Sequence, residues 1–401
     1  MPSDRTRFAR RRRTLAALAL LPWVSVDVRA RNAQVDEDFG DKPRPGGKDK
    51  SGNAIRQELD RYAGARPTNV AQVAAGGAHT VVVRRDGIAL AWGNNDAGQL
   101  GDGTRVSTPR PVLVTGGASW LDIAAGGSFS IGVKRDGSVW VWGQQGVERD
   151  AGAKRADARA LQGIGGAVAV AAGGQHALIL TGDGTLWGWG GNAFGQVGDR
   201  STQPRMGPVQ VASAVGIMSA GARHSLAVRR DGTLLAWGDN DLGQLGTGDG
   251  QYRNAPATVG QGYAFVAAGR SHSLAIRKDG SLVAFGDNRA GQLGDGTSAR
   301  RVTPIRVGTD SDWTAIAAGD AFSLGLRGTH LFAWGANDDG QLGVASAAAA
   351  STPQPVPGDF VRIAAGAHHS LALRQDGSVW AWGASDQGQA GAQRSAAPRQ
   401  V

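Results

Sequence analysis

The sequence predicts an all-β protein built from seven copies of one unit, and three observations lead to that prediction. A glycine that ends an Ala-Ala-Gly or Ser-Ala-Gly triplet, which we call the anchor glycine, recurs at intervals of 47 to 50 residues: Gly76, Gly126, Gly173, Gly221, Gly269, Gly319 and Gly366. An Asp-Gly pair follows the anchor in six copies, and a Trp-Gly or Phe-Gly pair follows it in all seven. Because a repeat of this length is one supersecondary unit, the seven copies are expected to form one continuous array.

The fourth copy shows how each unit is built. Two short β-like runs, residues 224–228 and 233–237, are separated by Asp231-Gly232. This spacing predicts a hairpin, because glycine tolerates the positive φ of a tight turn. The Gly-Gln-Leu-Gly run at 243–246 predicts an ordered loop that its glutamine and leucine anchor. The second copy alone lacks this run.

Each unit contains two further candidate strands. One begins near a proline, as at Pro256 and Pro304, and the other leads into the next anchor, as from Trp120 and Trp313. A four-stranded sheet of this size cannot bury both faces alone, but seven such sheets packed around an axis can. The aromatic residue of each Trp-Gly pair suits the space between neighbouring sheets, because its ring buries roughly 150–250 Å².

The ends of the chain predict how the ring closes. The first copy enters at its anchor and the strand of His79, whereas the last copy ends at Val401 without a following anchor strand. We therefore predict that residues 69–83 complete a sheet that the C-terminus begins, so that pairing of the N- and C-terminal strands closes the ring. On this prediction the repeat domain covers residues 69–401.

The first 30 residues have the order of a secretory signal. Arg10 to Arg13 are basic, residues 14–24 are apolar, and Val28-Arg29-Ala30 offers a small-residue cleavage site. Arg12-Arg13 resembles a twin-arginine export signal, and the apolar run is too short to span a bilayer. We expect residues 1–30 to be a signal peptide, 31–68 a polar linker, and the protein to be periplasmic or secreted. A basic tail on a cytoplasmic protein is the alternative.

Composition limits the chemistry. The chain has no cysteine, which excludes disulfides, thiolate chemistry and cysteine-based zinc sites. Seven arginines in residues 1–30 supply much of the net charge of +9, so no clustered nucleic-acid footprint is expected. No phosphate-binding loop, nucleophile elbow or metal-spaced cluster occurs. We expect no catalytic, cofactor or metal site, and a monomer without a membrane span.

One repeat position holds most of the histidines. Three residues after the anchor stand His79, His176, His224, His272 and His369, with Phe129 and Phe322 in the other two copies. A group that phenylalanine can replace is expected to pack against, or hydrogen-bond within, its own sheet. A metal-ligand or acid–base role is the alternative.

These motifs carry a family resemblance over residues 70–401. Ala-Ala-Gly-x-x-His-Ser-Leu-Ala-Leu, Asp-Gly, Trp-Gly-x-Asn and Gly-Gln-Leu-Gly together resemble the repeats of the regulator of chromosome condensation family. The resemblance implies a seven-bladed β-propeller of four-stranded antiparallel blades. The family includes exchange factors for a Ran-type GTPase, plant ultraviolet photoreceptors, secreted enzyme inhibitors and effectors of host GTPases, so the resemblance leaves function open.

The two positions after each anchor glycine are the first candidates for partner binding, because the resemblance places them in loops on one face. They supply Arg223, Arg270, Asp320 and His368, whereas the plant photoreceptors place Trp and Arg there. No tryptophan occurs at these positions, so light sensing is not expected. Tyr252 and Arg253, in the long loop of the fourth copy, form a second candidate pair; plain solvated loops are the alternative.

We therefore expect a non-enzymatic propeller that binds a protein partner through loops on one face. Guanine-nucleotide exchange on a small GTPase is an alternative that needs no catalytic triad, and inhibition of an extracellular enzyme is a second. In the irregular second copy, the charged stretch after Gly143 is either a decayed repeat or a binding insertion.

Overall fold

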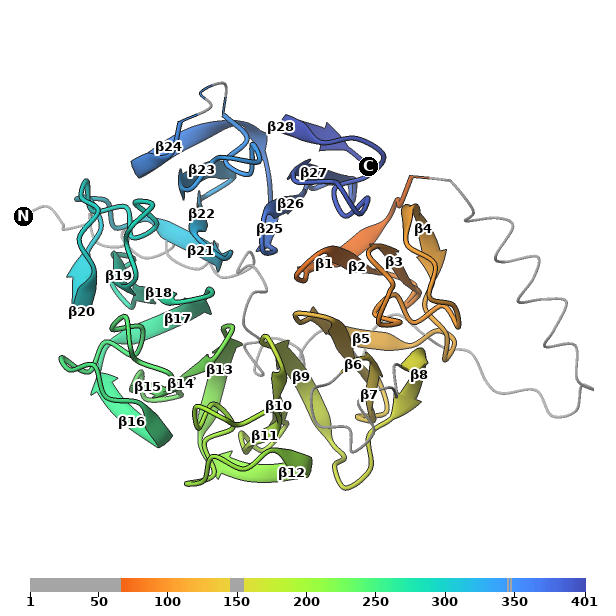
Figure 1. Ribbon diagram of the computed structural model, residues 1–401, viewed down its shortest axis with the longest axis horizontal. Coiled ribbons are helices and arrows are strands. Elements are labelled where there is room, and N and C mark those ends of the chain that lie inside the picture. The colour runs from red at the N-terminus through yellow and green to blue at the C-terminus, as the bar shows by residue number, and fades with distance from the viewer. Residues whose placement is uncertain (1–65, 145–154, 345, 347) are drawn as a thin grey trace, which may run out of the picture.

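The computed structural model describes residues 66–144, 155–344, 346 and 348–401. They form seven four-stranded antiparallel sheets in a ring, and no helix occurs in these ranges (Figure 1). The predicted seven-bladed propeller is therefore confirmed. The predicted signal peptide (1–30), most of the predicted linker (31–68) and residues 145–154 of the irregular second copy lie outside the described residues.

Each blade is one continuous segment of chain, whose strands run from the central axis outward in sequence order. Blades 1 to 3 comprise β1 (Val70–Ala75), β2 (His79–Arg84), β3 (Ala89–Gly93) and β4 (Thr108–Leu113); β5 (Trp120–Ala125), β6 (Phe129–Lys134), β7 (Val139–Gly143) and β8 (Arg155–Ala160); β9 (Ala167–Ala172), β10 (His176–Thr181), β11 (Leu186–Gly190) and β12 (Arg205–Ala212). Blades 4 and 5 comprise β13 (Val215–Ala220), β14 (His224–Arg229), β15 (Leu234–Gly238) and β16 (Arg253–Gly260); β17 (Tyr263–Ala268), β18 (His272–Arg277), β19 (Leu282–Gly286) and β20 (Arg301–Arg306). Blades 6 and 7 comprise β21 (Trp313–Ala318), β22 (Phe322–Arg327), β23 (His330–Gly335) and β24 (Ala350–Asp359); β25 (Arg362–Ala365), β26 (His369–Leu373), β27 (Val379–Gly383) and β28 (Ser395–Gln400).

The local predictions for the fourth copy are confirmed. Strands β14 and β15 pair around Asp231-Gly232, and Gly232 has the positive φ of 93° that the turn requires. The predicted loop is held by Gln244, whose side-chain oxygen accepts the N–H of Leu242 at 2.9 Å, and by fully buried Leu245.

The hydrophobic core lies between the blades rather than inside them. Trp142 of blade 2, for example, packs against Val81, Ala91 and Leu100 of blade 1. Each aromatic ring of a Trp-Gly or Phe-Gly pair is at most 2% exposed, as the sequence predicts. Because each blade buries its faces only against its neighbours, the ring is the stable unit.

A buried polar network also crosses most blade boundaries. His79 of blade 1 bonds to Ser130 of blade 2, which donates to the backbone carbonyl of Gln99 in blade 1; Trp142 donates to the same carbonyl. The histidine bond recurs at five boundaries, at 2.8–3.1 Å: His79–Ser130, His176–Ser225, His224–Ser273, His272–Ser323 and His369–Thr80. The rings do pack against their own anchor glycines, but the expected hydrogen bond inside the blade is wrong, because the bond joins two blades.

Among the described residues, the boundary between blades 2 and 3 lacks the whole network. Phe129 replaces the histidine, Ala177 replaces the serine, and the second copy has no Gly-Gln-x-Gly run to supply the carbonyl. Trp189 instead donates to the backbone of Met206 in its own blade, at 3.1 Å. The three changes fit together, because any one of the polar partners alone would be buried without a hydrogen bond.

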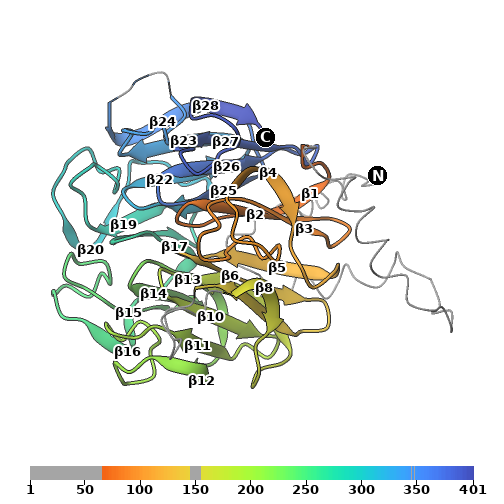
Figure 2. The same ribbon diagram turned by 45° about the vertical axis from the view of Figure 1, so that its right-hand side comes forward.

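The predicted closure by pairing of the N- and C-terminal strands is wrong. β1 pairs with β2 in blade 1, and β28 pairs with β27 in blade 7, so no blade combines the two ends of the chain. Figures 1 and 2 show blade 7 beside blade 1. The Val70 N–H donates to the Gly377 carbonyl at 3.2 Å, the same bond that Val215 makes to Gly184 between blades 3 and 4. The closing boundary therefore repeats the internal ones, and each anchor strand belongs to the blade that follows it.

Candidate functional site

Two kinds of loop share one face of the ring, which we call the anchor face. The loops between first and second strands carry the anchor glycines, and the loops between third and fourth strands carry the Gly-Gln-x-Gly runs. Backbone bonds join the two kinds of loop, as from Asp239 N–H to the Arg223 carbonyl at 2.9 Å. The Asp-Gly turns lie on the opposite face, which we call the turn face. All six candidate residues from the sequence therefore lie at the anchor end of their blades.

The buried histidines are not available for acid–base chemistry. Burial lowers the pKa of His79, His176, His224 and His369 to about 3 and that of His272 to about 4. All five are fully buried and engaged in the boundary network. Among the described residues, no group of three or more His, Cys, Asp or Glu side chains could hold a metal ion.

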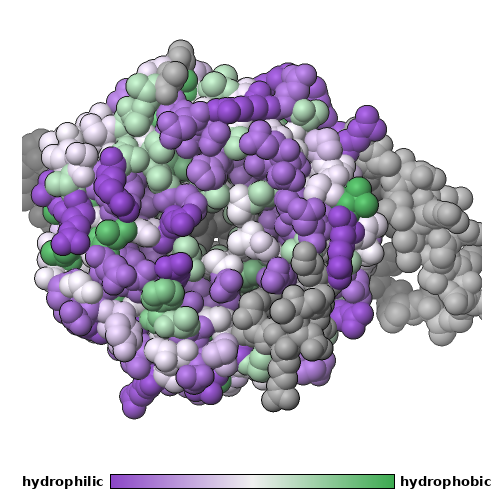
Figure 3. All heavy atoms as spheres, viewed as in Figure 1, coloured by the Kyte–Doolittle hydropathy of each residue, from purple (hydrophilic) through white to green (hydrophobic). Residues whose placement is uncertain are grey.

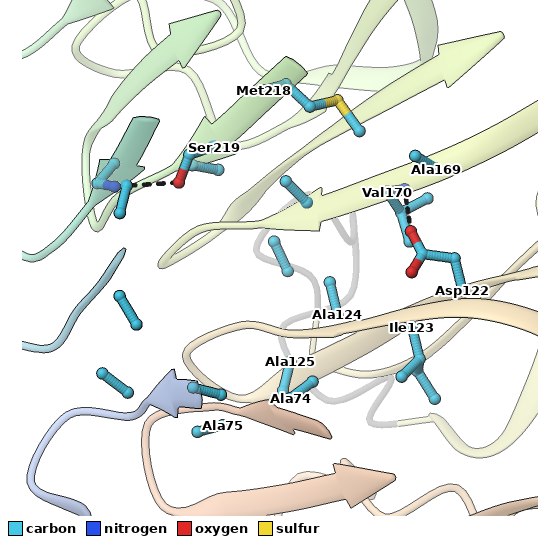
Figure 4. Close-up of a pocket in the computed structure, with 18 of the residues that line it drawn as sticks. Ala74, Ala75, Asp122, Ile123, Ala124, Ala125, Ala169, Val170, Met218 and Ser219 are labelled. Atoms are coloured by element: carbon cyan, nitrogen blue, oxygen red, sulfur yellow. Dashed lines mark hydrogen bonds between the residues drawn. The ribbon is translucent and has the colours of Figure 1, made fainter. Parts of the chain in front are cut away.

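The centre of the ring is hollow but chemically plain. A cavity of about 170 Å³ is lined mainly by alanines of the innermost strands, which point into it in Figure 4. Its polar side chains are engaged, since Asp122 accepts the Val170 N–H and Ser219 accepts the Ala268 N–H, both at 3.0 Å. Nothing in this lining resembles a catalytic group poised for reaction.

The rim of the hollow on the anchor face is formed by the residues that follow the anchor glycines. Arg270 and Asp320 stand at this position in blades 5 and 6, and the other blades place glycine or alanine there. Arg270 Nη1 lies 3.1 Å from Asp320 Oδ2, so two candidate residues neutralise each other across a blade boundary. As an exposed pair, they add little to stability.

The next position lies farther out and meets the preceding blade. There, His368 of blade 7 faces Asp339 of blade 6, with 3.3 Å between Nδ1 and Oδ2. Arg394, directly before β28, contacts the other Asp339 oxygen at 3.3 Å and bonds to the carbonyls of Asp338 and Asp339. His368, Asp339 and Arg394 thus form a polar triad on the boundary of blades 6 and 7.

The equivalent place between blades 3 and 4 has a different chemistry. The guanidinium carbon of Arg223 lies 4.6 Å from the ring centre of Phe194, which occupies the Asp339 position in blade 3. Tyr252 directly precedes β16, as Arg394 precedes β28, and its side chain is 55% exposed. Phe194, Arg223 and Tyr252 are therefore the counterparts of Asp339, His368 and Arg394.

Arg253 has a local role instead. Its guanidinium binds Asp249 at 2.6 Å within the same loop. Arginine–aspartate pairs also latch the loops of blades 3 and 5, from Arg205 to Asp199 and from Arg301 to Asp295. The recurrence of this latch in three blades marks Arg253 as part of the scaffold.

Sequence reasoning missed Phe194, Asp339 and Arg394. The first two precede the Gly-Gln pair in their copies, at a position that holds alanine in blades 1 and 5. A column-by-column comparison of this loop would have singled them out, but only the structure shows that the column faces the following blade.

The face seen in Figure 3 is mostly hydrophilic, with smaller hydrophobic areas between the polar residues. No helix in the described ranges is long and apolar enough to cross a membrane. Aromatic and arginine side chains are enriched among the residues that dominate binding at protein interfaces.

Comparison with known proteins identifies the family. The family model of the RCC1-like domain matches residues 45–322, and models of the regulator of chromosome condensation (RCC1) repeat match residues 330–373 and 360–389. The chain belongs to the RCC1-like family.

Several solved structures share the fold. Prp20p from Saccharomyces cerevisiae is 20% identical, with a TM-score of 0.70, over 80% of this chain and 84% of that chain. Human WBSCR16 is 21% identical, with a TM-score of 0.70, over 78% of this chain and 94% of that chain. Yeast RCC1 (Prp20) bound to Kap60 is 20% identical, with a TM-score of 0.70, over 91% of both chains. At these identities the likeness concerns the fold alone.

Proposed function

We propose that this chain is a non-enzymatic scaffold that binds a protein partner through its anchor face. The observation that carries the proposal is the loading of two blade boundaries with large polar and aromatic side chains. The boundary of blades 5 and 6 has Ala290, Ala321 and Ala349 at the same three positions. Because blades 5 and 6 pack with alanine at these three positions, the packing of neighbouring blades does not require the larger side chains found at the two loaded boundaries.

The structural neighbours support a binding role. Prp20p was described together with its binding properties to Gsp1p and histones, and yeast RCC1 (Prp20) was solved bound to Kap60. These partners belong to those proteins. They support the proposal, because propellers of the same fold have surfaces that bind other proteins.

Site-specific photo-crosslinking of the full chain tests the proposal. A benzophenone amino acid replaces Gln387 on the anchor face or, as the matched control, Gln375 on the turn face of the same blade; both glutamines are exposed. We expect position 387 to give a defined adduct that position 375 does not. The identified protein should then bind the purified full chain in solution. Adducts formed only from position 375 would contradict the proposal.

Guanine-nucleotide exchange is the second candidate, favoured by the shared fold with a protein that binds Gsp1p. Exchange would work by loops that displace the phosphate and Mg²⁺ contacts of the bound nucleotide. Release of fluorescent GDP from a panel of small GTPases should then accelerate with added protein. If the crosslinked partner is no GTPase and no panel member responds, simple binding remains.

Export of the protein is a separate proposal, based on the order of charges and apolar residues in segment 1–30. N-terminal sequencing of protein purified from the expressing cells should find Arg31 first. An intact Met1 on a cytoplasmic protein would refute export without touching the binding proposal.

A further inference from the structure

Arg223 is held in place by an aromatic ring rather than by a carboxylate of the described residues. Its guanidinium stacks on Phe194, and no ion pair to Arg223 occurs in the part of the chain that the structure describes. Other arginines of the anchor face are paired, as Arg270 is with Asp320 and Arg289 with Asp287. A guanidinium that stacks on a ring keeps its N–H edges free for two parallel bonds to a carboxylate.

At the equivalent positions of the boundary between blades 6 and 7, the polar side chains have a carboxylate partner. There, the Asp339 carboxylate accepts contacts from both His368 and Arg394. Between blades 3 and 4, Phe194 takes the place of that aspartate, so the internal acid is missing and an aromatic platform stands instead. The backbone positions correspond, but all three side chains differ, and the carboxylate is the partner that Arg223 lacks among them.

A second arginine stands close by. The Arg200 backbone N–H donates to the Asn254 carbonyl at 2.8 Å. Asn254 lies at the start of β16, two positions after Tyr252 in the sequence, so Arg200 lies beside this end of the strand. Arg200 is exposed, and it too has no ion pair within the described ranges. Two unpaired arginines with Phe194 and exposed Tyr252 combine positive charge with apolar surface.

We infer that the boundary of blades 3 and 4 binds an acidic segment of the protein partner, with an aspartate or glutamate on Arg223 and an adjacent apolar side chain against Phe194 and Tyr252. The inference rests on the proposed function and specifies its chemistry. A nucleic-acid backbone fits less well, because it would need a longer row of cations than this patch provides. Aromatic and arginine side chains in one patch favour a protein segment.

Selection from a random peptide library displayed on phage tests the inference, with the immobilised full chain as bait. We expect enriched peptides to share an Asp or Glu beside an aromatic residue or leucine. Arg223→Ala should weaken binding of a synthesised consensus peptide roughly tenfold, and Arg223→Lys should weaken it as well, because lysine cannot bind bidentately. Replacing the peptide's acid by its amide should have no further effect on the Arg223→Ala protein.

Arg85→Ala is the matched control, because Arg85 is an exposed arginine on the turn face, and it should leave the affinity unchanged. Arg223 is exposed, so its variants should keep the wild-type melting curve. The inference would be overturned by a consensus without carboxylates, by no enrichment, or by full binding of the peptide to Arg223→Ala. It would also be overturned if a single-stranded oligothymidine bound more tightly than the peptide and Arg223→Ala abolished that binding. Peptides lost with His368→Ala alone would overturn the inference but keep the anchor face as binding surface. Peptides whose binding is lost only when residues of the turn face are replaced would count against both proposals.

Discussion

His79 in blade 1 donates a hydrogen bond from Nε2 to Oγ of Ser130 in blade 2, over 2.8 Å. The direction follows from the serine, whose single proton is used to reach the Gln99 carbonyl at 3.0 Å. Nδ1 is buried without a hydrogen-bond partner among the described residues, so a second proton there would be unsatisfied. Burial also lowers the pKa of His79 to about 3, and the imidazole is therefore neutral with its proton on Nε2. One side chain thus joins two blades and fixes its own protonation state.

Removal of this bond should destabilise the ring. Ser130→Ala leaves the His79 N–H buried and unsatisfied, at an expected cost of about 1–3 kcal/mol in the free energy of unfolding. Urea denaturation followed by tryptophan fluorescence measures the loss. Ala177→Ser is the matched reverse change at the boundary that lacks the network, and it should bring no gain, because Phe129 offers no donor there. If neither variant changed the free energy of unfolding, the bond between His79 and Ser130 would contribute nothing to stability.

Acid should lower the free energy of unfolding already at pH values above those at which the carboxylates titrate. Burial lowers the pKa of the five boundary histidines to about 3 or 4, against about 6.5 in the unfolded chain. The unfolded state therefore binds protons first. The stability from the neutral histidines is complete above pH 6.5 and is lost as the pH falls towards 4, by about 1.4 kcal/mol per pH unit for each histidine.

The urea midpoint measured from pH 8 to pH 4.5 checks this dependence. His224→Phe imitates Phe129 and Phe322, and it should make the midpoint less sensitive to pH by removing one titrating group. The turn carboxylates stay ionised in this window; hydrogen bonds from Ser138, for example, lower the pKa of Asp136. An unchanged pH profile in the variant would refute the assignment.

Most of the fold could be predicted from the sequence, because seven copies repeat the same turn and strand signals. The blade assignment of the anchor strand could not. A strand that precedes each anchor glycine can pair with the copy before it or the copy after it, and both choices satisfy the pattern. In the structure Val73 pairs with Val82, which assigns the strand to the following hairpin.

The location of the candidate site on one face could be predicted from the sequence, but the contacts between its side chains could not. Arg270 and Asp320 hold the same column in adjacent copies with opposite charges, which is a sequence signal for contact. Arg223 and Phe194 stand at different positions of the repeat, so their contact depends on how far one blade is rotated against the next. That rotation is a property of the closed ring and is not encoded in any single copy.

The anchor glycines should not tolerate a side chain. A Cβ on Gly221 would lie 2.5 Å from His224 Cε1 and would collide with the Gly269 carbonyl of the next blade. Gly221→Ala should therefore destabilise the protein by about 1–3 kcal/mol or more, as overpacking does. Gly207→Ala is the control, since a Cβ there meets nothing within 4 Å and no positive φ occurs. Circular dichroism melts compare the two, and similar losses would mean that close approach is not the cause.

The closing boundary should tolerate covalent closure. Connections between blades span two to six residues, and fusing Val401 to Arg66 would leave five residues between β28 and β1. A permuted chain of residues 215–401 followed by 66–214 should fold with the stability of the linear 66–401 chain, because its new ends lie in a blade connection. A control opened at Asp231-Gly232 divides the β14–β15 hairpin and should be less stable in urea. If closure needed strands from both ends in one blade, the first permutant would fail to give the native circular dichroism spectrum.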